Sequence, residues 1–151
     1  MNYRRSHWLQ KSINPAADPD AGLAGKHADE SARQIVDLLL FANEADPGEN
    51  GVEGDPAFQD AFTRRFPKSH DGRSLADFQL NTRLFKHRCS YMIYSKTFET
   101  LPARIKSAVL QRLHHVLESE PAEGNYPDIK PSERHKIAAI LQETLPAWSG
   151  K

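Results

Sequence analysis

Residues 102–118 carry the most regular apolar pattern in the chain. Counted from Ile105, apolar side chains recur at positions i, i+4, i+8, i+11 and i+12, which lie on one face of an α-helix. Pro102 suits the first turn of such a helix, where its missing N–H is no loss. The pattern therefore predicts an amphipathic helix over 102–118. Its apolar positions are Ile105, Ala108, Val109, Leu113, Val116 and Leu117.

Two other long segments have helical periodicity. Residues 28–43 carry an apolar stripe widened by Leu38 and Phe41, so we expect this helix to make contacts on more than one side and to lie centrally. The last helix is expected to begin near Pro131 and to end at Pro146. Its inward-facing residues would be Ile137, Ile140, Leu141 and Leu145.

The middle of the chain shows shorter helix signals. Asp55 and Pro56 match the N-cap and the first position of a helix, and they predict a short one there. Ser74 and Asp77 have the spacing of a variant capping box, which predicts a helix over 74–85.

Strand signals are weak throughout the sequence. No segment alternates apolar and polar residues over the length of a strand, and the chain holds only four valines. The apolar residues of 89–98 can also share a helical face. We therefore predict an all-α fold, an irregular or orthogonal bundle of about five or six helices.

The N-terminal part of the chain has little to bury. Residues 12–27 mix prolines and glycines with alanine and aspartate, a composition that breaks both helices and strands. We expect a flexible lead over 1–27 and a single helical domain over 28–148. No apolar run has the length of a signal-peptide core or a membrane span, so the expected location is the cytoplasm, with no membrane contact.

Charge is balanced over the chain but not along it. Lys and Arg number 20, as do Asp and Glu, which argues against a general nucleic-acid-binding surface. Between residues 64 and 88, however, there are seven cationic residues and only two acidic ones, Asp71 and Asp77. We interpret this basic segment, together with Trp8 and Trp148 near the chain ends, as a candidate surface for a protein partner or an adjacent domain. The cations are Arg64, Arg65, Lys68, Arg73, Arg83, Lys86 and Arg88.

An intramolecular alternative exists for this basic segment. Residues 44–55 contain five carboxylates, three glycines and no basic residue, and they fit no calcium-loop register. This acidic connection could fold over the cations and neutralise them.

The single cysteine, Cys89, excludes an internal disulfide. Lys86, His87 and Arg88 precede it, and nearby cations lower a thiol pKa and make a cysteine reactive. A thiol-dependent enzyme or redox protein that uses Cys89, His87 and Tyr91 is therefore one alternative function. Cys89 also fits an apolar helical stripe, where an inert buried thiol is common.

Metal or haem binding is a further alternative. No two histidines are spaced three or four residues apart, so a site would have to combine distant residues such as His87, His114 and His135. We predict neither a metal nor another cofactor. The sequence contains no nucleophile elbow, glycine-rich phosphate loop or HExxH motif, so no catalytic motif supports an enzymatic function.

Part of the chain resembles a known sequence pattern. Residues 71–78 (DGRSLADF), 83–85 (RLF), 89–95 (CSYMIYS) and 98–102 (FETLP) are similar to a C-terminal helical region of uncharacterised bacterial proteins, many of them longer than this chain. The resemblance covers about residues 28–148. It implies a helical fold with no assigned activity, and a module that stands alone or is a piece of a larger protein. Arg88 stands where that pattern has a proline.

Overall fold

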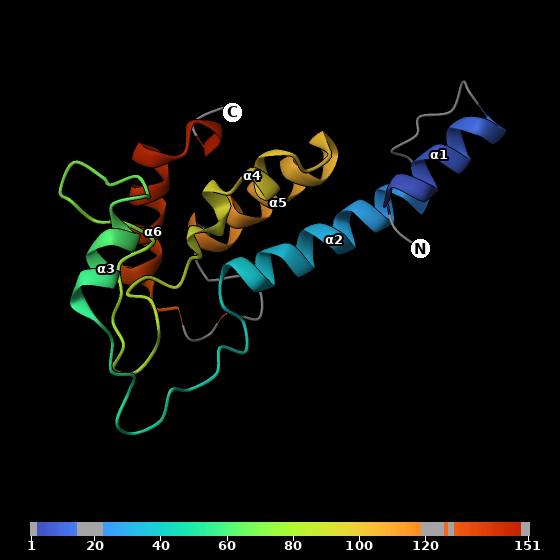
Figure 1. Cartoon of the computed structure of the whole chain (residues 1–151). Helices are drawn as coiled ribbons and strands as arrows, with labels where there is room; N and C mark the ends of the chain where they lie inside the picture. The colour runs from blue at the N-terminus through green and yellow to red at the C-terminus, as the bar shows by residue number, and fades with distance from the viewer. Residues whose placement is uncertain (1–2, 15–22, 119–125, 127–128, 149–151) are drawn as a thin grey trace.

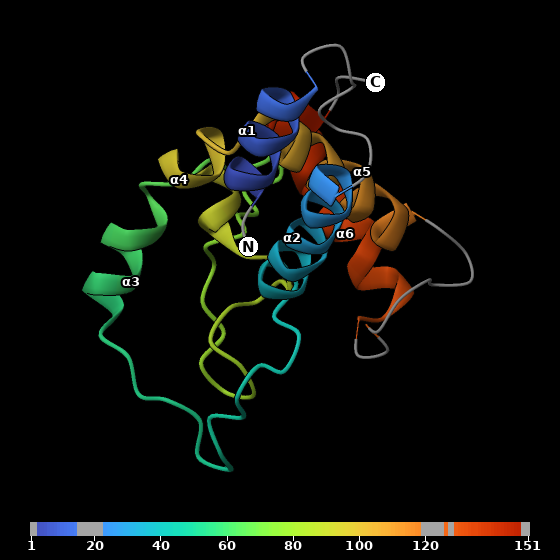
Figure 2. The ribbon, with the colours of Figure 1, turned by 90° about the vertical axis from the view of Figure 1, so that its right-hand side faces the viewer.

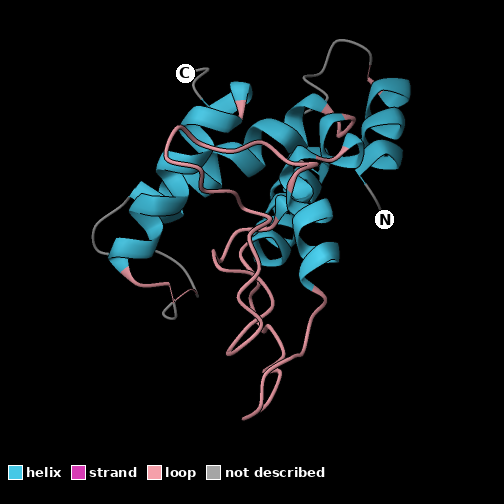
Figure 3. Cartoon of the chain, turned by 60° about the vertical axis from the view of Figure 1, so that its left-hand side comes forward, coloured by secondary structure: helices cyan, strands magenta, loops and turns pink. Residues whose placement is uncertain are grey.

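Three long helices form the centre of the molecule: α2 (Leu23–Leu39), α5 (Ala103–Glu118) and α6 (Pro131–Thr144). The computed structural model describes residues 3–14, 23–118, 126 and 129–148. α2 lies alongside α5, and α6 packs against α5 on another side (Figure 1). Within the described part of the chain there are six α-helices, two short 3₁₀ helices and no strand, which confirms the all-α prediction (Figure 3).

α5 follows its predicted pattern closely. Its buried residues are Ile105, Val109, Leu113, Val116 and Leu117, five of the six predicted positions. α6 begins at Pro131, as predicted, and buries Ile137, Ile140 and Leu141. Pro146 opens the 3₁₀ helix η2 (Pro146–Trp148) directly after α6. The prolines therefore mark the helix boundaries because a proline is tolerated only at a helix start.

Helical structure extends into the predicted lead. α1 (Tyr3–Ile13) packs against α2, which begins at Leu23, before the predicted start at residue 28. Tyr3 and Ser6 of α1 are buried. The flexibility of residues 1–27 stays a prediction, and residues 1–2 and 15–22 of that lead lie outside the described residues. Pro121 and Gly124, which predict a loop before the last helix, also lie outside the described residues.

The predicted helix over 74–85 is wrong. Ser74 and Asp77 do make capping bonds, because the Ser74 N–H donates to Asp77 Oδ2 (2.9 Å) and the Ala76 N–H donates to Ser74 Oγ (3.2 Å), but they close a turn instead of opening a helix. The chain then doubles back, and Phe78 pairs with Phe85 in an isolated antiparallel bridge. A helix would separate these two residues by about 10 Å along its axis. In the structure their ring centroids are 5.1 Å apart, which a helix does not permit.

Two serines start the short helices that follow. Ser90 caps the 3₁₀ helix η1 (Tyr91–Tyr94), and Ser95 caps α4 (Lys96–Glu99). The Ser90 N–H also donates to the Leu39 carbonyl (2.7 Å), which fixes this segment to the C-terminal end of α2. The helical face predicted over 89–98 is thus split into two short helices.

The acidic connection contacts the turn at residues 78–85 through its backbone. The Val52 N–H donates to the Leu80 carbonyl (2.7 Å). At Gly51, whose φ is +65°, an added Cβ would lie 2.5 Å from the same carbonyl oxygen. Glycine is required here because both the backbone conformation and the close approach exclude a side chain. None of the described helices combines the length and the apolarity that crossing a membrane requires.

Candidate binding surface

The helix α3 (Pro56–Thr63) stands apart from the α2 and α5 pair (Figure 2). Its start is as predicted: Asp55 is the N-cap and its side chain accepts from the Ala57 N–H (3.0 Å), with Pro56 in the first position. No residue of α3 is buried. Propensity and capping rarely stabilise so short a helix, so its attachment to the rest of the molecule must hold it in place.

Aromatic rings provide that attachment. The Phe62 ring lies 5.3 Å from Phe78 and 5.1 Å from Tyr91, measured between centroids. Phe66, just after the helix, lies 4.7 Å from Tyr91. Contacts of this kind contribute beyond their buried area, at about 0.5–1.5 kcal/mol each. They orient one face of α3 toward the core and leave the other toward solvent.

The solvent side combines an exposed aromatic ring with cations. Phe58 is 59% exposed although it stacks on Phe62. Beside it, a hollow of about 340 Å³ is lined by Arg64, Lys68, Phe78 and Lys86, with Asp60 and Asp77. Arg64 forms an ion pair with Asp60 at 3.6 Å in which both side chains are 76% exposed, so the pair is worth little. We name Phe58, Arg64, Lys68, Phe78 and Lys86 the α3 face.

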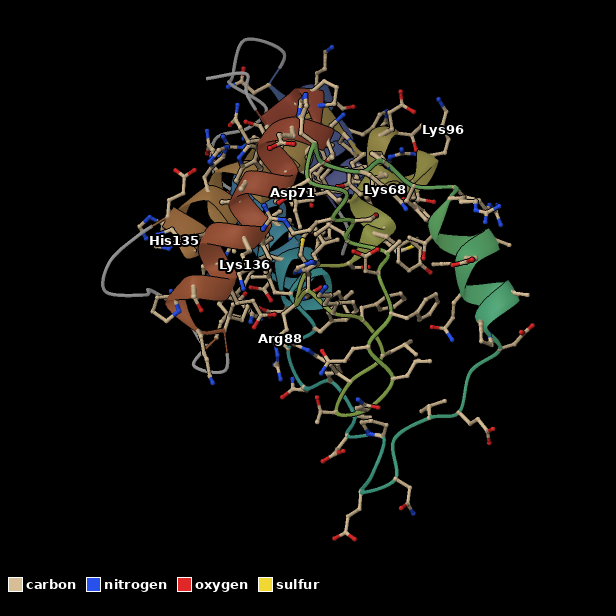
Figure 4. All side chains as sticks on the ribbon, turned by 90° about the vertical axis from the view of Figure 1, so that its left-hand side faces the viewer. Lys68, Asp71, Arg88, Lys96, His135 and Lys136 are labelled. Carbon is tan, nitrogen blue, oxygen red and sulfur yellow. The ribbon has the colours of Figure 1, made fainter. Side chains whose placement is uncertain are left out.

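The seven predicted cations occupy three different places. Arg64, Arg65, Lys68 and Lys86 are exposed, and all but Arg65 line the hollow beside α3. Arg73 and Arg83 form local ion pairs. Arg88 lies below α6 and apart from Lys68 (Figure 4), and it lines a hollow with residues of α2 and α5. The basic segment is therefore not one surface.

The two local ion pairs have structural roles. Arg73 pairs with Asp71 (2.5 Å) and, with the Ser69 hydroxyl, holds the pKa of that carboxyl well below its usual range. Arg83 pairs with Glu133 of α6 at 3.0 Å, with both side chains less than one-fifth exposed. Neither acidic partner belongs to the 44–55 connection. The ion pairs of Arg64, Arg73 and Arg83 thus form with carboxylates outside residues 44–55.

The structure places the candidate thiol in the core. Cys89 is fully buried, and burial raises the pKa of its thiol to about 12. A reactive cysteine needs a lowered pKa and access to solvent. His87 is also buried, and burial lowers the pKa of its imidazole. Within the described residues, no hydrogen-bond partner approaches His87 Nε2.

The three histidines considered for metal binding do not meet. His114 stacks on Trp148 with ring centroids 3.6 Å apart and its Nε2 lies 3.1 Å from the Trp148 carbonyl oxygen. His135 is exposed on α6 (Figure 4). In the part of the chain that the structure describes, no three His, Cys, Asp or Glu side chains are grouped to hold a metal ion.

The two tryptophans differ in their availability to a partner. Trp8 is 66% exposed on α1, as a surface role requires. Trp148 is 1% exposed, so its predicted place on the surface is wrong. The cause is its stacking on His114, which draws η2 onto α5.

Comparison with known proteins adds nothing to this geometry. No family model, no curated protein and no solved structure matches the chain. The resemblance to a helical region of bacterial proteins stays a prediction. Two arginines that the sequence analysis did not single out, Arg33 and Arg112, line a second hollow with Arg88. They lie on different helices, and no sequence spacing relates them.

Proposed function

We propose that this chain is a non-catalytic helical module that binds a protein partner, or another domain, through the α3 face. The observation that carries the proposal is the exposure of α3. A helix without any buried residue is held against the molecule by aromatic rings, yet it presents Phe58 and a cation-lined hollow to solvent. An exposed aromatic ring surrounded by charged groups is typical of a binding surface.

The charges indicate the kind of partner. Three cations and two carboxylates line the hollow, and Arg65 is an additional exposed cation next to Arg64. Because opposite charges steer association, the surface favours an acidic segment. Phe58 and Phe78 favour an apolar side chain within that segment. The expected partner is thus an acidic peptide region with an apolar anchor.

Charge reversal tests the proposal. Arg64→Glu, Arg65→Glu and Lys68→Glu are combined in one variant, and proteins from the source organism that co-purify with it are quantified against the wild type. The matched control reverses three exposed lysines elsewhere: Lys26, Lys96 and Lys136. Both variants change the net charge equally, so a difference between them reports the location of the charges.

We expect a partner that the wild type and the control retain and that the α3 variant loses. Phe58→Ala should weaken binding of the same partner, because it removes the exposed ring that contacts the partner's apolar side chain and leaves the charge unchanged. Binding of the identified partner is then measured by calorimetry with purified proteins. If both charge-reversal variants lose the same proteins to the same extent, binding is non-specific and the α3 face is not the site.

The remaining expectations about the biological setting stay predictions from the sequence. These are a bacterial origin, a cytoplasmic location and a function as a stand-alone module or as part of a larger protein. The Cys89 alternative is disfavoured by the burial and the raised pKa of the thiol. The thiol-enzyme alternative would be supported if Cys89 of the folded protein reacted at neutral pH as fast as Cys89 of the denatured chain.

A further inference from the structure

A second hollow lies beside the C-terminal half of α2. It has a volume of about 590 Å³ and is bounded by α2, the turn at residues 41–43, α5 and the residues before α6. A neighbouring hollow of about 560 Å³ continues along α2 and α5, and both are lined by Arg112 and Tyr126. Sites for small molecules usually have volumes of about 300–1,000 Å³.

Three arginines from separate parts of the chain line this hollow. Arg33 comes from α2, Arg112 from α5 and Arg88 from the segment before η1. Among the described residues that line it, the only carboxylate is Asp37. Arg33 pairs with Glu30 (2.9 Å) as well as with Asp37 (3.1 Å), so two carboxylates of its own helix compensate its charge. Arginine binds phosphate and carboxylate groups through two parallel hydrogen bonds, which makes it the usual residue for such anions.

Asp37 already has two partners. Arg33 Nη1 lies 3.1 Å from Asp37 Oδ2, and the Tyr126 hydroxyl donates to Asp37 Oδ1 (2.5 Å). The Arg112 side chain in turn forms a hydrogen bond with Tyr126. Burial, followed by the bond to Asp37, raises the pKa of Tyr126 to about 12, so the phenol stays neutral. These contacts orient two of the arginines before any ligand arrives.

Apart from the arginines, Asp37 and Tyr126, the hollow is lined by Asn43 and by apolar side chains. Leu40 and Ile129 are buried, and Phe41 stacks on Phe85 with ring centroids 6.0 Å apart. The Arg88 N–H donates to Glu133 Oε1 (3.0 Å), which fixes the backbone that carries the third arginine. Cationic and apolar walls in one hollow suit a molecule with an anionic group on an apolar or ring-shaped body.

We propose that this hollow binds a small dianionic molecule that carries a phosphate monoester or two carboxylates. Arg88 and Arg112 contact the anionic group, and Arg33 with Asp37 and Tyr126 positions Arg112. The proposal does not depend on the α3 face, whose residues line neither hollow.

Calorimetric titration of the full chain tests this site. The probes are two dianions, adenosine 5′-monophosphate and succinate. Adenosine, which lacks the phosphate, and acetate, which carries only one carboxylate, are the controls. We expect one dianion to bind with 1:1 stoichiometry and both controls to show no binding. Whichever dianion binds shows whether the site takes a phosphate monoester or a dicarboxylate. Absence of binding by both dianions overturns the proposal.

Two substitutions locate the binding event. Arg112→Gln should weaken the dianion at least tenfold, because it removes a charge-assisted hydrogen bond. Arg64→Gln, which changes the net charge equally on the α3 face, should leave the affinity unchanged. Equal weakening by both would mean non-specific attraction and would refute the site. If Arg112→Gln does not fold, Arg88→Gln replaces it with the same expectation.

Discussion

Arg134 is the buried cation on which the packing of α6 depends. It is 6% exposed, and its guanidinium donates to three backbone carbonyls: Ile129 (2.9 Å), Val116 (3.3 Å) and Tyr126 (3.2 Å). Val116 lies near the C-terminal end of α5, and the other two carbonyls precede α6. A single side chain thus joins α5, α6 and the residues between them. Arg134→Met keeps the length and the aliphatic stem and removes all three bonds.

The magnitude follows from these distances. A hydrogen bond to a charged group contributes about 1.5–3 kcal/mol, so three would contribute at least about 4.5 kcal/mol. Two of the bonds are at or beyond the usual length limit and contribute less. Removing a buried charge also relieves part of its desolvation cost. We therefore expect Arg134→Met to lower the free energy of unfolding by about 3 kcal/mol.

Urea unfolding followed by circular dichroism measures this loss. With a slope of about 2 kcal/mol per molar urea, the midpoint should fall by about 1.5 M. Arg134→Lys keeps the charge but not the planar fork, so its loss should be intermediate. Arg104→Met on α5 is the control, because its side chain is 43% exposed and its ion pair with Asp29 is long, at 3.6 Å. If Arg134→Met and Arg104→Met shift the midpoint equally, the three carbonyl bonds do not stabilise the fold.

Three further predictions test other buried or constrained groups. Because burial raises its thiol pKa to about 12, Cys89 should react with a disulfide reagent at pH 8 far more slowly in the native protein than in urea; equal rates would contradict its burial. Burial lowers the pKa of His87 from its ordinary value of 6.5. As the pH falls below about 6.5, the His87 imidazole is therefore protonated more readily in the unfolded chain than in the folded protein, and the free energy of unfolding decreases. His87→Leu should flatten the fall in unfolding free energy between pH 7.5 and 5, whereas His135→Leu, at an exposed position, should keep the wild-type slope; identical slopes for the two variants would contradict this. Gly51→Ala should cost about 1–3 kcal/mol in urea unfolding because its Cβ meets a carbonyl oxygen of the neighbouring turn, and more than Gly48→Ala, which has a positive φ but nothing within 4 Å; equal losses would refute that contact.

The helices that the sequence predicts well are those whose signals are local. In α5 the apolar spacing alone selects the buried face, since burial of one stripe stabilises an amphipathic helix. In α3 the Asp55 side chain and Pro56 determine the first turn independently of the rest of the chain. Such features depend on residues within one or two turns, and therefore the sequence is sufficient to predict them.

The start of α2 shows why other helical segments are missed. Ala24, which belongs to the predicted lead, lies in the first turn of α2 and is fully buried although it is small. Small residues allow helices to approach closely, but in a sequence they give only a weak apolar stripe. Together with the nearby prolines and glycines, they suggested an irregular segment. Their role becomes visible only when the partner helix is present.

The turn at 78–85 shows a different cause. Its capping signal is genuine, and the expected side-chain bonds form. The outcome is decided by Phe78 and Phe85, whose rings join Phe62 and Tyr91 in one cluster. Tertiary packing of distant aromatic residues thus overrides a local helix signal. No property of residues 74–85 alone contains that information.

The same distinction applies to the candidate sites. A run of positive charge along the chain suggests a continuous basic surface, but a charge acts where the fold places it. Arg83 pairs with Glu133 of α6, Arg73 pairs with Asp71 of its own loop, and Arg88 lines a hollow together with Arg33 and Arg112. The exposed remainder beside α3 and the arginine-lined hollow beside α2 are therefore two separate candidate sites, for which we propose different ligands. Arg64→Gln and Arg112→Gln separate them, because each should weaken one kind of binding and leave the other unchanged.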